Sequence, residues 1–167
     1  MAIILITGGA RSGKSTRAEM RACGFAGRPV YIATAEALDS EMGERIARHR
    51  ARRGNDWLER EAPLELIPAL DETDGDGARL VDCLTLWLTN LMLAERDWEK
   101  EVKLLAETLG QQKSPVVLVT NEVGLGIVPD NALARRFRDA AGILNQMIAR
   151  AADEVEFVVA GLPMRVK

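Results

Sequence analysis

The sequence has few of the residues that would indicate a disulfide-stabilised or membrane-spanning protein. Of its 167 residues, two are cysteines, one is a histidine and 4% are aromatic. A chain of this length folds around its own core without a disulfide framework, so we expect Cys23 and Cys83 to be buried, reduced thiols. No apolar run approaches the length of a membrane span, and the run at residues 2–6 has no basic segment before it. We therefore expect neither a signal peptide nor stable membrane insertion.

The chain also lacks an excess of positive charge. The chain has 22 Lys and Arg against 25 Asp and Glu, for a net charge of −3. Proteins that follow the phosphates of nucleic acid are usually strongly basic, so we expect no nucleic-acid partner. The hydrophobic content of 47% suits one compact domain over residues 1–167, and the cytoplasm is the expected compartment.

Apolar runs alternate with helical patterns along the chain. The runs predict strands at residues 3–7, 30–34, 80–84, 116–120 and 155–160. The helical patterns predict helices at residues 13–25, 39–53, 84–94, 97–109 and 131–152. The polar stretch at 71–77 is predicted to be a surface loop. This alternation predicts a three-layer α/β fold, with a mostly parallel sheet and helices on both faces.

A phosphate-binding motif lies between the first predicted strand and the first predicted helix. Residues 8–15, GGARSGKS, satisfy G-x-x-x-x-G-K-[ST]. In this motif backbone N–H groups surround an anion, Lys14 reaches the terminal phosphates and the Ser15 hydroxyl binds Mg²⁺. The alternative is a structural glycine turn with a solvated lysine, but the complete motif in this position favours nucleoside triphosphate binding. The fold is therefore predicted to be of the P-loop, RecA-like type.

A P-loop protein also needs a carboxylate near its metal ion. Asp82 ends the apolar run RLVD, which is the place of such a carboxylate, although a surface aspartate at a strand end is the alternative. Asn121 and Glu122 follow the run at 116–120. They are candidates either for substrate contact or for capping and loop fixation.

His49, the single histidine, lies in the arginine-rich stretch ERIARHRARRG. Helical spacing places His49 on the face of Ile46, beside a stripe of Arg45, Arg48 and Arg52, so that phosphates held there would lie next to the imidazole. Two interpretations remain open: a hydrogen-bonded histidine at the edge of the core, or a nucleophile that carries a nucleotidyl group. Helix geometry alone favours the first.

Six segments together resemble one enzyme family. They are ITGGARSGKS, VYIATAEALDSEM, RIARHRARRG, VDCLTLWLTNLM, LVTNEVGLGIVP and ARRFRDAAGILNQ, in the family's order and over nearly the whole chain. The sequence is similar to the bifunctional adenosylcobinamide kinase/adenosylcobinamide-phosphate guanylyltransferases of cobalamin biosynthesis. Some members have two adjacent histidines where this chain has Arg48 and His49.

The resemblance implies two reactions, with GTP, ATP and Mg²⁺ as cofactors and a corrinoid as substrate. The hydroxyl of the aminopropanol arm would be phosphorylated, and GMP would then pass from GTP through His49 to that phosphate. His49, Lys14 and Asp82 would be catalytic, Ser15 and Asp82 would bind the metal, and Glu61 would contact the guanine edge. The nucleotide-contacting positions would be Gly8, Gly9, Ala10, Arg11, Ser12, Gly13, Lys14, Ser15, Ile32, Ala33, Thr34, Arg50, Ala51, Arg52, Arg53, Glu61 and Asp82.

The family also implies a homo-oligomer, with a trimer as the expected form. Two other functions are compatible with the residues alone. One is a P-loop kinase of another small molecule, with no covalent nucleotidyl intermediate. The other is a non-catalytic nucleotide-binding or nucleic-acid-binding module, against which the acidic balance counts.

Overall fold

Strands and helices alternate along the chain in the computed structural model, which describes residues 1–35 and 56–167. The helix predicted at 39–53 lies outside the described residues. The strands are β1 (Ile3–Thr7), β2 (Val30–Ala33), β3 (Leu58–Glu61), β4 (Arg79–Asp82), β5 (Val116–Val119), β6 (Glu154–Val159) and β7 (Leu162–Arg165). The helices are α1 (Lys14–Cys23), α3 (Leu66–Glu72), α4 (Leu84–Leu93), α5 (Trp98–Leu109) and α6 (Ala132–Ala151).

These strands form one sheet in the order β3-β2-β4-β5-β1-β6-β7. All neighbouring pairs are parallel except β6 and β7, which form an antiparallel hairpin at one edge. The central strand β1 is buried along Ile3–Ile6, as its unbroken apolar run predicts. The prediction of a mostly parallel sheet is therefore confirmed.

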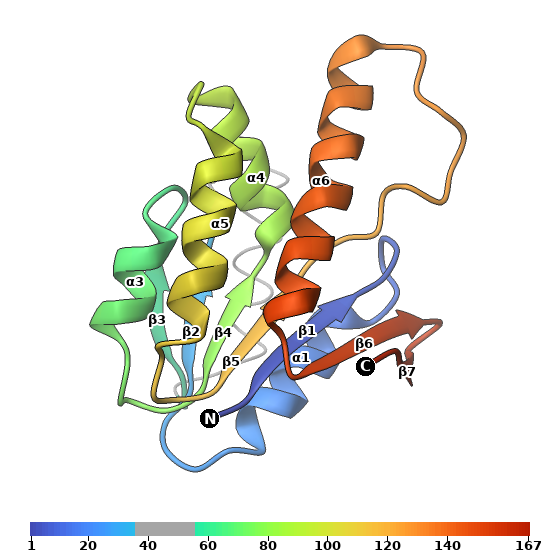
Figure 1. Ribbon diagram of the computed structural model, residues 1–167. Coiled ribbons are helices and arrows are strands. Elements are labelled where there is room, and N and C mark those ends of the chain that lie inside the picture. The colour runs from blue at the N-terminus through green and yellow to red at the C-terminus, as the bar shows by residue number, and fades with distance from the viewer. Residues whose placement is uncertain (36–55) are drawn as a thin grey trace.

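Helices cover both faces of the sheet (Figure 1). On one face, Ala18 and Ala22 of α1 pack against a core that includes Ile4 of β1 and Val117 of β5. On the other face, α3, α4, α5 and α6 bury a larger core around Trp87, whose side chain is fully buried. This arrangement is the predicted three-layer α/β fold. No helix in the described ranges is both long enough and apolar enough to cross a membrane.

Three elements, β3, β7 and α3, were not predicted from the sequence, and the strand predicted at 80–84 ends two residues early, at Asp82. Strand β3 and strand β7 are not indicated by apolar runs, because the side chains of both lie largely exposed at the two edges of the sheet. Helix α3 contains Pro68 in its first turn, where a missing N–H costs no helical hydrogen bond. Asp71 and Glu72 belong to the last turn of α3, so the loop predicted at 71–77 is shorter than expected.

The prediction for the two cysteines is half wrong. Cys83 is buried, but Cys23 is exposed. The inward face of α1 carries Lys14, Ala18 and Ala22, which repeat every four residues. Cys23 follows Ala22 directly, and a step of one residue turns a helical side chain by about 100°, away from that face.

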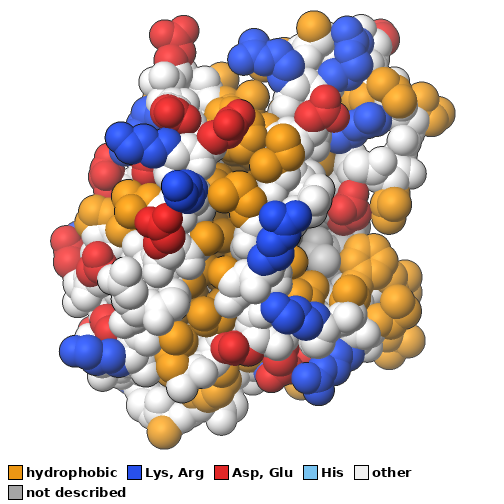
Figure 2. Space-filling model, viewed as in Figure 1, with side chains coloured by type: hydrophobic (Ala, Val, Ile, Leu, Met, Phe, Trp, Pro, Cys, Tyr) orange, Lys and Arg blue, Asp and Glu red, His pale blue; other side chains and the backbone are white. Residues whose placement is uncertain are grey.

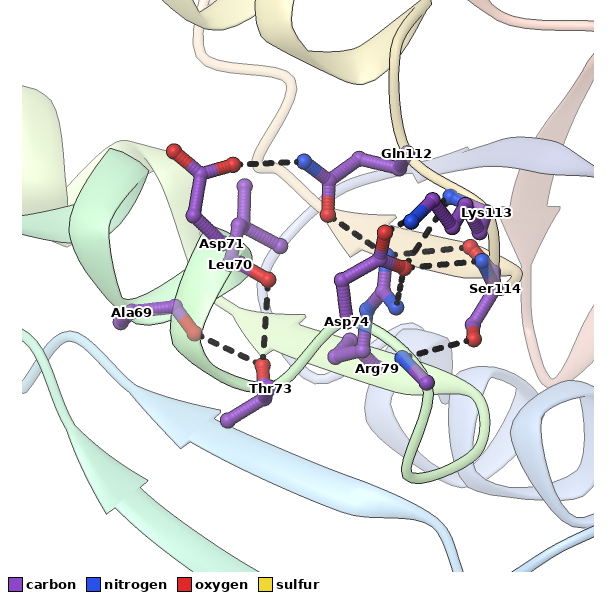
Figure 3. A network of polar contacts seen from close by, with 10 residues as sticks. Ala69, Leu70, Asp71, Thr73, Asp74, Arg79, Gln112, Lys113 and Ser114 are labelled. Atoms are coloured by element: carbon purple, nitrogen blue, oxygen red, sulfur yellow. Dashed lines mark hydrogen bonds and ion pairs between the residues drawn. The ribbon is translucent and has the colours of Figure 1, made fainter.

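A polar network closes the amino end of the sheet (Figure 3). The Arg79 side chain is fully buried, and it donates to Asp74 at 2.6 Å and to Gln112 at 2.8 Å. The Asp74 carboxylate also accepts hydrogen bonds from the backbone N–H groups of Lys113 and Ser114. Burial raises the pKa of Asp74. The hydrogen bonds from Ser114, Lys113 and Arg79 together lower it by more, so the pKa of Asp74 lies below its ordinary value. The network pairs a buried guanidinium on β4 with the loops that follow α3 and α5.

Candidate active site

The carboxyl ends of six parallel strands lie at one edge of the sheet, and five of these strands share a row of register partners. One row of register partners crosses it, from Glu61 of β3 through Ala33 of β2, Asp82 of β4 and Val119 of β5 to Ile6 of β1. Open parallel sheets bind ligands outside this edge. Glu61, Ala33 and Asp82, all predicted to be near nucleotide, thus lie on adjacent strands, and the phosphate loop leaves the same edge at the end of β1.

The phosphate loop presents the N-terminus of α1. Gly13 precedes the helix with φ of 97°, in the left-handed region that favours glycine, and no side chain in the described ranges caps this end. The first N–H groups of α1 are therefore available to an anion, which the helix dipole also favours. Lys14 is buried, and its ammonium donates to the Gly9 carbonyl at 2.5 Å. The loop thus places one buried cation at the anion-binding end of the helix.

Two buried hydroxyls support a ligand at this loop. Within the described part of the chain, Thr7 Oγ1 and Ser12 Oγ are buried without a hydrogen-bond partner. Buried polar atoms are rarely left unpaired unless a water, ion or ligand completes them. The Gly161 N–H donates to the Ser12 carbonyl at 2.8 Å, so the turn between β6 and β7 supports the loop from behind. The residues present therefore fit a bound phosphate.

Glycine is required at Gly8, the first position of the motif. A Cβ atom there would lie 2.4 Å from the Val158 carbonyl oxygen of β6 and 2.9 Å from Ser12 Oγ. Its φ of 153° lies at the limit of the region that other residues avoid. The close approach of β6 explains why the motif begins with a residue that has no side chain.

Asp82 and Ser15 fit a magnesium site. The Asp82 side chain is half-buried at the end of β4. Residues 1–35 and 56–167 contain no group of three or more acidic, histidine or cysteine side chains that could hold a metal ion. Mg²⁺ commonly binds one or two protein oxygens and completes its shell with phosphate and water, so it needs no such cluster. One carboxylate and one hydroxyl beside bound phosphates are sufficient.

Thr34 lies where β2 ends, beside the end of β4. It is fully buried, and its carbonyl accepts a hydrogen bond from Asn90 Nδ2 of α4 at 2.9 Å. The same Nδ2 donates to the Pro63 carbonyl at 2.9 Å, so Asn90 joins the exits of β2 and β3. Ile32 is also fully buried, with its side chain in the core.

Sequence reasoning missed Asn90 and a second network that joins β5 to two helices. Thr120 donates to Asn145 Oδ1 of α6 at 2.7 Å, and Thr85 of α4 accepts from the Asn121 N–H at 2.7 Å. The sequence does contain a pattern that indicates these contacts. The runs IILIT, VYIAT and VVLVT each end in a threonine, which lies at the end of β1 or directly after β2 and β5. Such a threonine can bond backbone groups where the sheet ladder stops.

The contacts of Glu122 favour the loop-fixing interpretation. Its N–H donates to the Gly8 carbonyl at 3.0 Å, and its carboxylate accepts from the Gly124 N–H at 2.5 Å. The segment after β5 is thereby joined directly to the phosphate loop.

Comparison with solved structures supports the fold. The chain superposes on the P4 protein of bacteriophage phi6 in complex with ADP, with a TM-score of 0.55, 13% identity and 98% of this chain covered. It also superposes on an ATPase of a bacterial type III secretion system, with a TM-score of 0.58, 14% identity and the same coverage. The chain spans about half the length of each, 54% and 56%. Both likenesses concern the fold, which is of the P-loop NTPase type.

Comparison of sequences establishes the family. The family described as cobinamide kinase / cobinamide phosphate guanyltransferase matches residues 4–166. The chain belongs to this family. It is 51% identical to the bifunctional adenosylcobalamin biosynthesis protein CobP of Pseudomonas aeruginosa, over 98% of this chain and 96% of that protein. It is 42% identical to the protein CobU, described in the same words, of Salmonella typhimurium, over 99% of both chains. The resemblance seen in the six sequence segments is confirmed.

As a member of the cobinamide kinase / cobinamide phosphate guanyltransferase family, the chain is a bifunctional enzyme of adenosylcobalamin biosynthesis. The residue roles are a separate question. His49, Arg50, Ala51, Arg52 and Arg53 lie outside the described residues.

Cys83, next to Asp82, is not a candidate nucleophile for either reaction of the family. Burial raises the pKa of its thiol to about 11, and the nearby Asp82 carboxylate adds to this effect. The thiol therefore stays protonated at neutral pH, and the thiolate is the reactive form.

Proposed function

We propose that both reactions of this cobinamide kinase and guanyltransferase take place at the carboxyl edge of the sheet. The observation that carries the proposal is the register row that sets Glu61, Ala33 and Asp82 on neighbouring strands of the edge from which the phosphate loop leaves. The two unpaired hydroxyls in or beside the loop support the presence of a bound phosphate there.

In the kinase step, ATP or GTP lies with its phosphates in the loop at residues 8–15. The hydroxyl oxygen of the aminopropanol arm attacks the γ-phosphorus and loses its proton to solvent, the bond to the β–γ bridging oxygen breaks, and the nucleoside diphosphate leaves. Lys14 stabilises the charge on the transferring group. Its ammonium already lies within the loop, bonded to the Gly9 carbonyl, so little reorganisation is needed when phosphate replaces that contact.

Ser15 and Asp82 would hold Mg²⁺ in this step. The ion, when bound, neutralises charge on the phosphate oxygens. The Ser15 hydroxyl lies in the first turn of α1, and Asp82 ends β4, so both belong to the same edge of the sheet. Both are oxygen donors, which Mg²⁺ prefers.

In the second step, His49 carries the guanylyl group. A ring nitrogen attacks the α-phosphorus of GTP, a nitrogen–phosphorus bond forms, the α–β phosphate bond breaks, and pyrophosphate leaves. A phosphate oxygen of cobinamide phosphate then attacks the same phosphorus and displaces the histidine, which gives the GDP derivative. Arg50, Arg52 and Arg53 would neutralise the leaving pyrophosphate, and Glu61 would accept hydrogen bonds from the guanine edge.

The proposed partners are a corrinoid, a nucleoside triphosphate and further copies of the chain, without nucleic acid. A homo-oligomer, with a trimer as the expected form, is supported by the exposed apolar side chains of Leu162 and Met164 on the edge strand β7. The mass of the assembly, measured by light scattering, tests it. The proposed compartment is the cytoplasm.

Labelled GTP tests the histidine intermediate. With α-labelled GTP we expect label to remain on His49. With γ-labelled GTP we expect no label on His49. The adduct should be lost in acid and persist in alkali, as a nitrogen–phosphorus bond does, and His49→Ala should abolish it together with guanylyl transfer. A P-loop kinase without a covalent intermediate would give no α-label. If His49→Ala still accumulates α-label, the histidine is not the nucleophile.

A further inference from the structure

The segment at residues 123–129, between β5 and α6, exposes large aliphatic side chains. Leu125 is 81% exposed and Ile127 is 96% exposed, and Val128 is also exposed. The segment, VGLGIVP, contains no charged residue. It arches away from the body of the molecule (Figure 1, light orange), and hydrophobic side chains stand out at that place in Figure 2. A contiguous exposed apolar stretch indicates a contact surface, whereas single exposed aliphatic residues need no explanation.

Both ends of this segment are held by hydrogen bonds. At its start the N–H of Glu122 donates to the Gly8 carbonyl of the phosphate loop. At its end the Arg135 guanidinium donates to the carbonyls of Pro129 and Asp130, at 2.8 and 2.7 Å, and Asn131 caps α6. The aliphatic side chains are thus presented between two fixed points.

The hydrogen bond from Glu122 to Gly8 indicates which ligand this segment contacts. Its start is bonded to the loop that would hold the reacting phosphates, so a molecule seated on the segment lies beside the site of phosphoryl transfer. The family's name gives cobinamide as the substrate. As a corrinoid, cobinamide has a large flat macrocycle with methyl groups and uncharged amides at its rim. An uncharged aliphatic surface matches that rim, because burial of both removes apolar area from water and leaves no charge unpaired.

We propose that residues 123–128 form the seat of the corrin ring and present the aminopropanol hydroxyl to the phosphate loop. This inference rests on the proposed function and names the surface that selects its substrate. The nucleotide contacts the phosphate loop, whereas the ring contacts Leu125 and Ile127. Binding of the two ligands is therefore separable by substitution.

The test compares Leu125→Ser/Ile127→Ser with a control, Leu93→Ser, which changes an aliphatic side chain of similar exposure at the end of α4. Binding of dicyanocobinamide is measured by equilibrium dialysis, which requires no turnover. We expect the double variant to bind it about tenfold more weakly or worse, since each aliphatic side chain loses a buried contact. The KM for cobinamide should rise by a similar factor, while the KM for ATP and the mass of the assembly stay unchanged. The control should match the wild type.

Other outcomes overturn the inference. Unchanged dicyanocobinamide binding would show that the ring lies elsewhere. If the double variant dissociates, the segment contacts a second copy of the chain and not the corrin ring. If the KM for cobinamide and the KM for ATP change equally, the segment shapes the phosphate loop and does not bind the ring. If the double variant does not fold, as judged by circular dichroism, each single variant is measured and should weaken binding about threefold or more. A wild type that binds dicyanocobinamide but transfers no phosphoryl group would contradict the proposed function and leave the seat intact.

Discussion

The Thr34 hydroxyl bonds both polar groups of the Cys83 backbone. It donates to the Cys83 carbonyl and accepts from the Cys83 N–H, at 2.7 Å in each case. Thr34 directly follows β2 and Cys83 directly follows Asp82, so one side chain joins the ends of two neighbouring strands. This contact therefore fixes Asp82, the proposed metal-binding residue, relative to Thr34, after which the chain continues toward His49.

Thr34→Val should weaken both the fold and the reaction. Valine has nearly the same shape but leaves the Cys83 N–H without its acceptor, which costs about 1–3 kcal/mol, whereas the Cys83 carbonyl keeps its hydrogen bond from the Trp87 N–H. We expect a lower free energy of unfolding in urea and reduced Mg²⁺-dependent turnover. Thr34→Ser keeps the hydroxyl and should restore most of both. Turnover at the wild-type rate in the valine variant would show that this contact does not position Asp82.

Lys14→Ala should abolish most phosphoryl transfer and leave the fold intact. The ammonium is the cation that the phosphate loop presents, and loss of one such preorganised donor costs about 10²-fold or more in rate. The kinase rate with saturating cobinamide and the urea midpoint measure the two effects. Lys113→Ala, at the opposite end of the sheet, is the matched control and should react normally. Full kinase activity in Lys14→Ala would contradict the role assigned to the loop.

Asp82→Asn should lower turnover more than nucleotide affinity. The carboxylate lies half-buried at the end of β4, where a metal ion beside the phosphates acts on charge that develops during transfer. A Mg²⁺ titration of the rate should shift to higher concentrations, while ATP binding without Mg²⁺ changes little. An unchanged titration would leave Asp82 as a structural residue and make Glu122 the next candidate.

Glu156 should contribute stability that disappears in acid. Its carboxylate accepts two hydrogen bonds from Arg17, at 2.7 and 2.8 Å, and one from Arg21, at 2.5 Å. The hydrogen bonds from Arg17, opposed by burial, lower the pKa of Glu156 below its ordinary value. A lowered folded-state pKa gives stability that is complete above the unfolded pKa, about 4.3, and is lost as the pH falls through the folded value.

Glu156→Gln tests this pH dependence. The variant should be less stable than the wild type at pH 7, and the difference in the free energy of unfolding should narrow as the pH falls below about 4. Urea unfolding at a series of pH values measures it. A difference that does not change with pH would mean that the Glu156 charge contributes nothing and only its shape matters.

Asp74→Ala should destabilise the protein without affecting the active site. The variant would leave the fully buried Arg79 guanidinium without its carboxylate, and an unpaired buried charge costs about 3–5 kcal/mol. Asp76→Ala changes an exposed carboxylate of the same loop and should cost about 0.5 kcal/mol or less. Because the network lies at the amino end of the sheet, the KM for ATP should be unchanged in both. An equally stable Asp74→Ala variant would show that Arg79 finds another partner.

Local patterns in the sequence determined most of the elements and the phosphate loop. Continuous β-branched runs predicted β1, β2 and β5, each within one residue, because strands buried on both faces must be apolar throughout. The glycines and the lysine of residues 8–15 identified the loop, since the anion-binding conformation needs those residue types at that spacing. The apolar run RLVD placed Asp82 at a strand end, because the run stops at this charged residue.

Only the tertiary structure decided which of these elements meet. Strand β3, LERE, has no apolar pattern, because within the described residues it pairs with β2 alone and its side chains are largely exposed, yet this pairing places Glu61 next to Ala33. The exposure of Cys23 and the pairing of Thr34 with Cys83 likewise depend on contacts between segments distant in sequence. Such contacts follow from how strands are ordered and how helices pack on the two faces. A local pattern of residues indicates which side chains of a segment must be buried. It does not indicate which other segment they pack against.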